Sequence, residues 1–256
     1  ILSRRVWRLG KTKIDVILIS HPDADHFNGL EKIIERFDVG VVLVSPYMFV
    51  KRTSKKIAEN DNPNDDTDNP NNTKKSEIDR NFEGVIRLRE LLQERKIPVV
   101  EIASGDDLIA YGLPESAILH PPRDGFETEE SNVTSVVLQF AHNRIRILLP
   151  ADLDGKLRSP FLSLPPTHCD VMMVPHHGGN SKETEPLLKW ATPNLLIIND
   201  GGFTHRTFPI EQYQKQNKTV HSTRDNGYIK IIIDKTGLQE KTLNKKSRHH
   251  KVGDVK

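Results

Sequence analysis

The chain has 256 residues, enough to bury one sizeable core, and its charged residues sum to a net charge of only +2. That balance excludes the broad basic field typical of nucleic-acid-binding proteins. Cys169 is the single cysteine, which excludes an intrachain disulfide and a thiolate zinc cluster, so a metal here has to be held by His and Asp. The longest apolar stretch, residues 39–50, is too short to span a bilayer.

The first predicted elements are a strand, a loop, a helix and a second strand. Residues 14–19 form a nearly continuous apolar run, typical of a buried strand, and residues 39–44 form another. Between them, apolar residues recur at helical spacing from Leu30 to Phe37. The His- and Asp-rich run at residues 21–26 therefore lies in a strand-to-helix loop.

A polar tract rich in Asn and Pro follows at about residues 51–78. It offers almost no side chains to bury, so we interpret it as a disordered insertion within the domain. After this tract, the apolar spacing of residues 82–92 predicts an amphipathic helix that ends before Pro98.

Short strands make up much of the second half. Residues 99–102, 107–111 and 116–119 are separated by Gly-containing turns and predict an antiparallel meander. Residues 135–140 and 145–149 predict a hairpin that leads into Asp152. The last third alternates strands at 170–174, 194–198 and 228–233 with helices around Leu187 and Ile210. This order indicates an α/β fold in which two sheets are covered by helices.

The run His21-x-Asp23-x-Asp25-His26 predicts a metal site. Its imidazole nitrogens and carboxylate oxygens suit zinc, manganese or iron, and the two Asp residues favour harder ions such as manganese. The alternative is a polar turn in which Asp25 is the N-cap of a helix starting near Asn28.

Further candidate ligands follow other predicted strands: His120, Asp152, His176, His177 and His205. Asp152 comes directly after an apolar strand, where its charge is costly unless it is exposed, capping a helix or bound to a metal. The two imidazoles of the Pro175–Gly179 loop are followed by two glycines, which let the backbone approach a ligand closely. For His120, as for His142 and His221, a solvated side chain is the competing interpretation.

Six blocks of the sequence resemble, in the same order, the metallo-β-lactamase-like domain of the ComEC family of competence proteins, which act in bacterial DNA uptake. They are SHPDADHFNGL from Ser20, ILHPP from Ile118, NVTSVVLQF from Asn132, LLPADLD from Leu148, DVMMVPHHGGNS from Asp170 and TRDNGYIKI from Thr223. The resemblance covers residues 13–234 without the polar insertion.

The resemblance implies the αββα four-layer sandwich of the metallo-β-lactamase type, with a two-metal site in the loops at one edge. We expect one such domain over residues 1–238, followed by a basic disordered tail at 239–256. The superfamily's first strands are expected upstream of Ile1, so the chain is expected to be the C-terminal piece of a longer protein.

The resemblance also implies roles for individual residues. His21 and Asp23 would hold one divalent ion, Asp25 and His26 a second, and Asp152 would bridge the two; zinc and manganese are the expected ions. His176 or His177 would add a ligand, His120 or Asn132 would complete the first site, and His205 is a further candidate. Asp25, Asp152 and His177 are the expected catalytic residues. Two departures are Ala151 in place of a glycine and Thr204-His205-Arg206 in place of Gly-His-Pro.

The implied function is metal-dependent hydrolysis. Two cations would share a hydroxide that attacks a phosphodiester of DNA, with Lys182 and Arg206 holding flanking phosphates. One alternative is a hydrolase of small esters, lactones or thioesters. Another is a metal-free module that binds DNA or a partner protein, using the basic residues of 241–256. No nucleotide cofactor is expected.

The resemblance further implies a location on the outer face of the bacterial membrane, with a membrane-channel portion upstream in the full-length protein. A free-standing hydrolase would instead be cytoplasmic.

Overall fold

The computed structural model describes residues 10–51, 70–124, 131–154, 160–179, 184–200 and 208–243. The chain divides into two compact units, and each has its own sheet and its own hydrophobic core. The first unit comprises Ile1–Ala103 and Pro121–Val136, and the second comprises Ser104–His120 and Val137–Lys256.

The sheet of the first unit is parallel throughout. Its strands are β1 (Lys13–Ile19), β2 (Asp38–Val44) and β3 (Val99–Glu101), in the order β1-β2-β3. The strands predicted at 14–19 and 39–44 are thereby confirmed. Gly40 permits their close approach, because a Cβ at this position would lie 2.5 Å from the carbonyl oxygen of Asp15.

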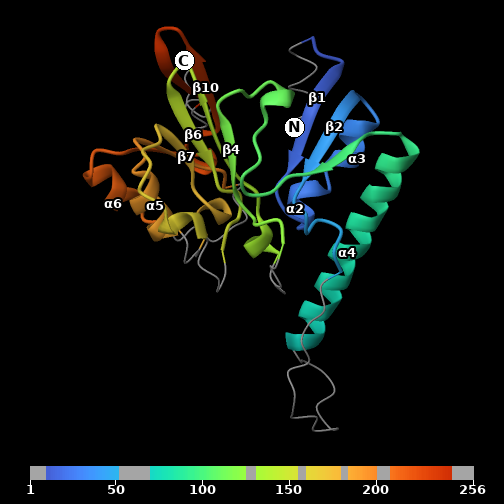
Figure 1. Cartoon of the computed structure of the whole chain (residues 1–256). Helices are drawn as coiled ribbons and strands as arrows, with labels where there is room; N and C mark the ends of the chain where they lie inside the picture. The colour runs from blue at the N-terminus through green and yellow to red at the C-terminus, as the bar shows by residue number, and fades with distance from the viewer. Residues whose placement is uncertain are drawn as a thin grey trace, which may run out of the picture. The chain divides into compact units, whose positions relative to one another are not determined.

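Three helices pack on this sheet: α2 (Ala24–Phe27), α3 (Leu30–Ile34) and α4 (Pro70–Glu94). Figure 1 shows α3 and α4 beside β2. Their apolar side chains, among them Phe27, Ile34 and Leu88, join Val42 and Val44 of β2 in one core. Burial of this apolar face supplies the main stabilisation of the unit.

Helix α4 begins earlier than the sequence indicates. It starts at Pro70, a favourable first position for proline, so residues 70–78 of the predicted insertion are helical rather than disordered. Val85, Leu88 and Leu92 are buried and hold the C-terminal half of the helix against the core. Once this half is formed, each residue added toward the polar N-terminal half gains one backbone hydrogen bond, which favours extension of the helix. Residues 52–69 lie outside the described part.

The predicted antiparallel meander over 99–119 is wrong. β3 pairs in parallel with β2 in the first unit, whereas 107–111 contains the 3₁₀ turn η1 (Ile109–Tyr111) and a single bridge from Leu108 to Leu113. Gly112, at φ 85°, closes this turn, and the Ser116 hydroxyl accepts from the Leu108 N–H at 2.7 Å. A tight turn therefore replaces the expected middle strand.

The second unit contains a six-stranded sheet whose spatial order follows the chain. Its strands are β4 (Ser116–His120), β5 (Val137–His142), β6 (Ile145–Leu149), β7 (Val171–Met173), β8 (Leu195–Ile198) and β9 (Thr219–Ser222). β4 to β6 are antiparallel, as the predicted hairpin requires, and β6 to β9 are parallel. The carboxyl ends of β6 to β9 therefore meet at the same sheet edge, where ligands bind in open α/β sheets.

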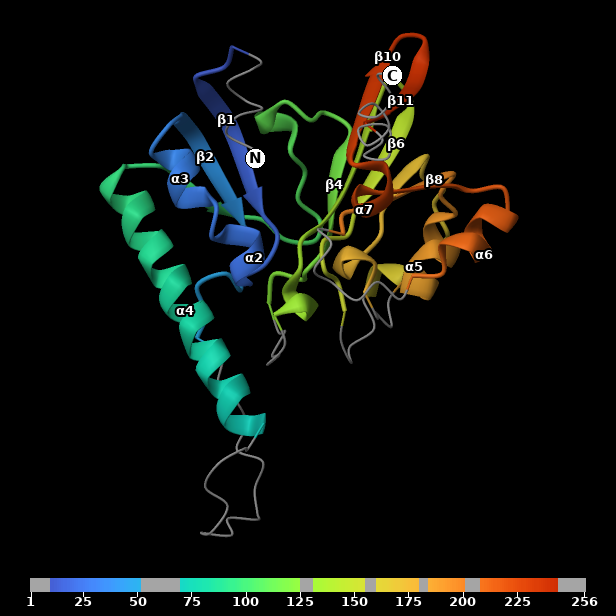
Figure 2. The ribbon, with the colours of Figure 1, turned by 180° about the vertical axis from the view of Figure 1, so that it is seen from behind.

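Helices α5 (Thr184–Ala191) and α6 (Ile210–Lys215) pack against this sheet, beside β8 in Figure 2. Trp190 of α5 and Tyr213 of α6 join a core that includes Met172 and Leu196. The remaining short elements are η2 (Asn132–Thr134), which belongs to the first unit, and η3 (Pro160–Ser163), η4 (His176–Gly178) and α7 (Thr223–Asn226).

A hairpin of β10 (Tyr228–Asp234) and β11 (Gly237–Leu243) ends the described part of the chain. Residues 239–243, predicted to begin a disordered tail, are thus paired strand. The turn explains this pairing, because Asp234 accepts hydrogen bonds from Thr236, which also lower the pKa of the Asp234 carboxyl. Among the helices within the described ranges, none is long and apolar enough to cross a membrane.

Candidate metal centre

The first group of predicted ligands lies on the segment after β1, within the first unit. His21 is fully buried in the loop, Asp23 is the N-cap residue of α2, and Asp25 and His26 lie inside α2. The alternative in which Asp25 is the N-cap is therefore wrong. Asp23 makes no side-chain capping hydrogen bond, so its carboxylate is not engaged with the helix end.

Two close His–carboxylate contacts occur on this segment. His21 Nε2 lies 3.4 Å from Asp23 Oδ2, and His26 Nε2 lies 3.6 Å from Asp25 Oδ2. Two atoms that bind one tetrahedral zinc ion at about 2.0–2.1 Å are themselves about 3.3 Å apart. Both contacts are close to the separation that a shared ion requires.

The burial of the His21 Nε2 atom gives a further indication. It is buried and has no hydrogen-bond partner within the described ranges. Leaving a buried polar atom without a partner costs about 1–3 kcal/mol, so an atom of this kind needs an explanation. A metal ligand would satisfy it, because the nitrogen would then donate its lone pair to a cation.

The second group lies at the carboxyl ends of β6 and β7, within the second unit. Asp152 follows β6 and is buried, with its Oδ2 atom 3.4 Å from His177 Nε2. The Nδ1 atom of His177 lies 3.0 Å from the carbonyl oxygen of Asn199, which can only accept a hydrogen bond. Nδ1 therefore carries the proton of the neutral ring, and Nε2 keeps the lone pair that a metal needs.

His176 faces a different carboxylate from its neighbour. Its Nδ1 atom lies 3.6 Å from Asp154 Oδ2, while His177 faces Asp152. The sequence spacing left these two histidines equivalent. The structure separates them, because each imidazole pairs with its own Asp.

The loops that hold these side chains have an uncommon backbone. Ala151, His176 and His177 all have φ between 51° and 53°, the left-handed region that non-glycine residues rarely adopt. The His176 N–H donates to the Ala151 carbonyl oxygen at 3.3 Å, which ties the two loops together. Such conformations cost of order 1–3 kcal/mol each and gather at functional sites.

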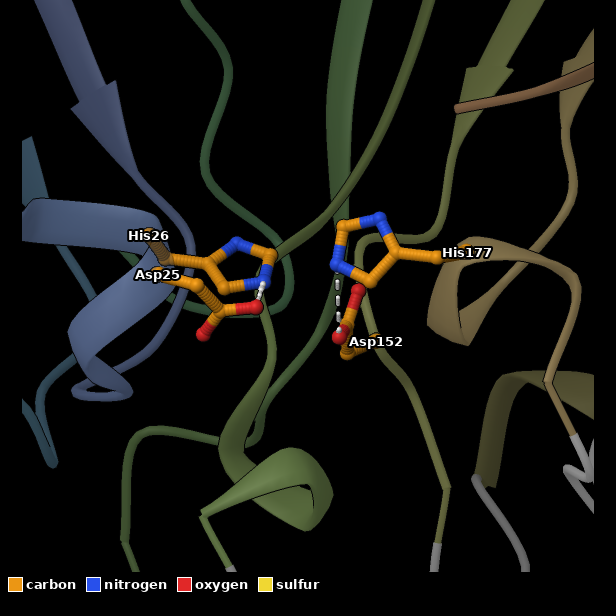
Figure 3. Close-up of side chains that lie close together, drawn as sticks. All are labelled: Asp25, His26, Asp152 and His177. Carbon is orange, nitrogen blue, oxygen red and sulfur yellow. Dashed lines mark ion pairs between the residues drawn. The ribbon is translucent and has the colours of Figure 1, made fainter. Parts of the chain in front are cut away.

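Figure 3 shows two of these pairs, each joined by its ion-pair line: Asp25 with His26 from α2, and Asp152 with His177 from the loops after β6 and β7. Within each pair, the imidazole nitrogen and the carboxylate oxygen are atoms that can bind a metal ion. His and Asp donors of this kind suit zinc or manganese.

The remaining candidates have different outcomes. His120 is buried at the end of β4, and the buried Oδ1 atom of Asn132 has no hydrogen-bond partner in the described part, so both stay candidates for completing the site. His142 is exposed, and His221 pairs with Glu240 of β11. His205 lies outside the described residues, as do Lys182 and Arg206.

Sequence reasoning missed three contributors. Asp154 stands two residues after Asp152, and this D-x-D spacing could have marked it. Asn199 acts through its backbone carbonyl, which leaves no signal in residue type. Ser20 directly precedes the His- and Asp-rich run, and its hydroxyl contacts two of the predicted ligands.

The chain is similar to one protein superfamily and to two individual proteins. The model of the metallo-beta-lactamase superfamily matches residues 2–198 of the chain. Recombination protein 2 of Haemophilus influenzae is 26% identical over 108 residues, which are 41% of this chain and only 14% of that protein. Among solved structures, the CmlA beta-hydroxylase E377D mutant is similar with a TM-score of 0.44 and 14% identity, over 82% of this chain and 43% of that one.

Proposed function

Because the chain belongs to the metallo-β-lactamase superfamily of metal-dependent α/β-sandwich hydrolases, we propose that it hydrolyses phosphodiester bonds in DNA with the aid of two divalent ions. The observation that carries the proposal is the repeated His–carboxylate pair, at 3.4 Å for His21 and Asp23 and again for His177 and Asp152. These separations favour a tetrahedral ion, so zinc is the first candidate and manganese the second.

The two halves are proposed to act on the same substrate. His21, Asp23, Asp25 and His26 would hold ions from the first unit, and Asp152 and His177 from the second. Asp152 has two carboxylate oxygens, which allows one side chain to serve both ions. The Asn199 carbonyl keeps the His177 ring in the tautomer that has its proton on Nδ1 and its lone pair on Nε2, where a metal ion would bind.

Divalent ions bound here would supply an acidified water as nucleophile and would neutralise charge on the scissile phosphate. The chain's own groups would orient that reaction. Asp25 keeps 65% of its side chain exposed, so its carboxylate can accept a proton and pass it to solvent. Lys182 and Arg206 would hold the neighbouring phosphates of the strand.

DNA is the proposed substrate class for two reasons. The relative from Haemophilus influenzae is named a recombination protein, and recombination acts on DNA. The second reason is the resemblance of the six sequence blocks to the metallo-β-lactamase-like domain of the ComEC family, a resemblance that the family model supports at the level of the superfamily. We therefore propose that the activity serves DNA uptake.

The first prediction concerns Asp152→Asn. The amide keeps the shape of the side chain but removes the charge that would hold the ions, so we expect DNA cleavage in zinc or manganese to fall at least about 100-fold. Cleavage of labelled single- and double-stranded DNA measures this effect. Asp15→Asn is the control, because the carboxylate of Asp15 is exposed on β1 and pairs with Lys13. This variant should cleave DNA at the wild-type rate.

Two outcomes would redirect the proposal. Metal-dependent turnover of a lactone or thioester with both DNA forms left intact would replace the substrate by a small molecule. Absence of bound zinc or manganese in elemental analysis, with DNA still retained in a binding assay, would make the chain a binding module instead.

We also propose that the chain works within a longer membrane protein, on its extracytoplasmic side. The chain spans a small part of its relative's length, which leaves room for a channel portion in a protein of that kind. A protease-sensitive tag fused to this domain of the full-length protein should be cut in intact spheroplasts. Protection of the tag until the cells are lysed would place the domain in the cytoplasm.

A further inference from the structure

One serine hydroxyl contacts two of the predicted metal ligands. Ser20 Oγ lies 3.0 Å from Nδ1 of His21 and 3.3 Å from Nδ1 of His26. The two rings are close neighbours, with centroids 4.1 Å apart and planes tilted by 48°. Both imidazoles thus present the same nitrogen to one hydroxyl, although six positions separate Ser20 from His26.

The backbone holds Ser20 at this position. It directly follows the last residue of β1, and its carbonyl oxygen accepts a hydrogen bond from the Val136 N–H at 2.9 Å. The chain then turns through Asp23 into α2, where the His26 N–H donates to the Asp23 carbonyl oxygen at 2.9 Å. This turn carries His26 back over the end of β1, so the hydroxyl meets both rings.

The number of protons limits how these contacts can be made. A serine hydroxyl has one proton to donate and two lone pairs to accept with. It cannot donate to both imidazoles, so at least one ring donates its Nδ1–H to Ser20. A ring that donates through Nδ1 has its lone pair on Nε2, which is the state a metal ligand requires.

The Nε2 atoms of His21 and His26 lie on the other side of each ring from Ser20, and each faces a carboxylate of the predicted site. His21 Nε2 is buried and lies 3.4 Å from Asp23 Oδ2, so an ion held between this nitrogen and this carboxylate needs the lone pair on Nε2. His26 Nε2 lies 3.6 Å from Asp25 Oδ2, which is the same arrangement of an imidazole nitrogen and a carboxylate. In both rings, binding an ion through Nε2 therefore requires the proton on Nδ1, next to Ser20.

We propose that Ser20 is a positioning residue that accepts Nδ1–H hydrogen bonds from His21 and His26 and so keeps both Nε2 atoms ready to bind a metal ion. This proposal rests on the metal site proposed above and assigns the group that prepares half of it. Ser20 itself would touch neither ion nor substrate.

The test compares Ser20→Ala, Ser20→Thr and the wild type in two measurements. ¹⁵N NMR of the imidazoles in the metal-free protein, at a pH where the rings are neutral, reads the tautomer directly. Zinc titration by calorimetry reads the affinity. Ser45→Ala is the matched control, because Ser45 is also a buried serine of the first unit but is not a candidate ligand.

We expect Nδ1–H tautomers for His21 and His26 in the wild type and in Ser20→Thr, which keeps the hydroxyl. In Ser20→Ala the Nε2–H tautomer should appear, and zinc affinity should fall about 10- to 100-fold, as for other residues that orient metal ligands. Ser45→Ala should match the wild type. Far-UV circular dichroism checks that each variant folds.

The idea is overturned if the wild-type rings carry their protons on Nε2, or if Ser20→Ala binds zinc as tightly as the wild type. A different result would refute the proposed metal site while leaving the role of Ser20 intact. Nδ1–H tautomers that depend on Ser20, in a chain that binds neither zinc nor manganese, would support the hydrogen bonds and refute the proposed function.

Discussion

At the scale of single residues, the metal-binding candidates differ in how they are held. His177 is oriented by a backbone carbonyl, whereas His21 and His26 share a side-chain hydroxyl. Both arrangements use Nδ1 and leave Nε2 toward a carboxylate. The residue types were visible in the sequence, but a backbone acceptor has no residue type to reveal it.

Cys169 gives a prediction that is independent of the metal. Burial, reinforced by the charge of Asp170, raises the pKa of its thiol from 9.0 to about 12. At pH 8 the folded thiol should react with DTNB about a thousandfold more slowly than in urea, because the thiolate is the reactive form. Reaction at the rate of the unfolded chain would contradict the buried placement.

The raised pKa of Cys169 also makes the stability of the fold depend on pH. Between pH 9 and about 12 the folded chain retains a proton on Cys169 that the unfolded chain releases. The free energy of unfolding should therefore fall as pH rises through that range. Cys169→Ser lacks this titration, so its urea midpoint should decline less steeply over the same range.

At the scale of elements, the loops after β6 and β7 determine how the second half of the site is presented. The His176 N–H is bonded to Ala151, and a Cβ on Gly179 would lie 2.9 Å from the His176 carbonyl oxygen. The sequence indicated that glycines in this loop allow a close backbone approach. At Gly179 this approach is to the carbonyl oxygen of His176, which leaves no room for a side chain. Parallel pairing of β6 with β7 brings these loops to one edge.

Ala151→Gly should stabilise the metal-free protein by about 1 kcal/mol, because φ of 53° strains alanine but not glycine. Urea unfolding measures the change. Ala141→Gly in β5 is the control and should destabilise by about 0.5–1 kcal/mol, since glycine in a strand with ordinary φ only adds freedom to the unfolded chain. Equal destabilisation by both changes would show that residue 151 is not strained.

Several element predictions were confirmed by strong local patterns. The apolar runs at 14–19 and 145–149 and the helical spacing around Leu187 all correspond to observed elements. The segment at 107–111 was different, because its Gly-bounded pattern suits either a strand or a turn. Gly112 at positive φ and the Ser116 hydroxyl decided for the turn.

At the scale of the whole molecule, a metal that binds only the folded chain should raise its stability. Zinc at about 100 times its dissociation constant should add about 2.7 kcal/mol, and EDTA should remove it. Differential scanning calorimetry would show the shift in Tm. His177→Ala should lose most of it, while His142→Ala, which changes an exposed residue at the end of β5, should keep it.

Retention of the full zinc-induced shift in His177→Ala would remove His177 from the site and leave His176 with Asp154 as the pair to test next. Loss of the shift in His142→Ala as well would indicate non-specific zinc binding to surface histidines.

The sequence by itself determined the superfamily and the residues of the His- and Asp-rich run, because ligands a few positions apart on one loop and helix start are close by local geometry alone. The tertiary structure decided which imidazole meets which carboxylate. His176 and His177 are adjacent in the chain, yet left-handed backbone angles turn them toward Asp154 and Asp152. Ser20 gained its role in the same way, since only the turn into α2 returns His26 to the end of β1.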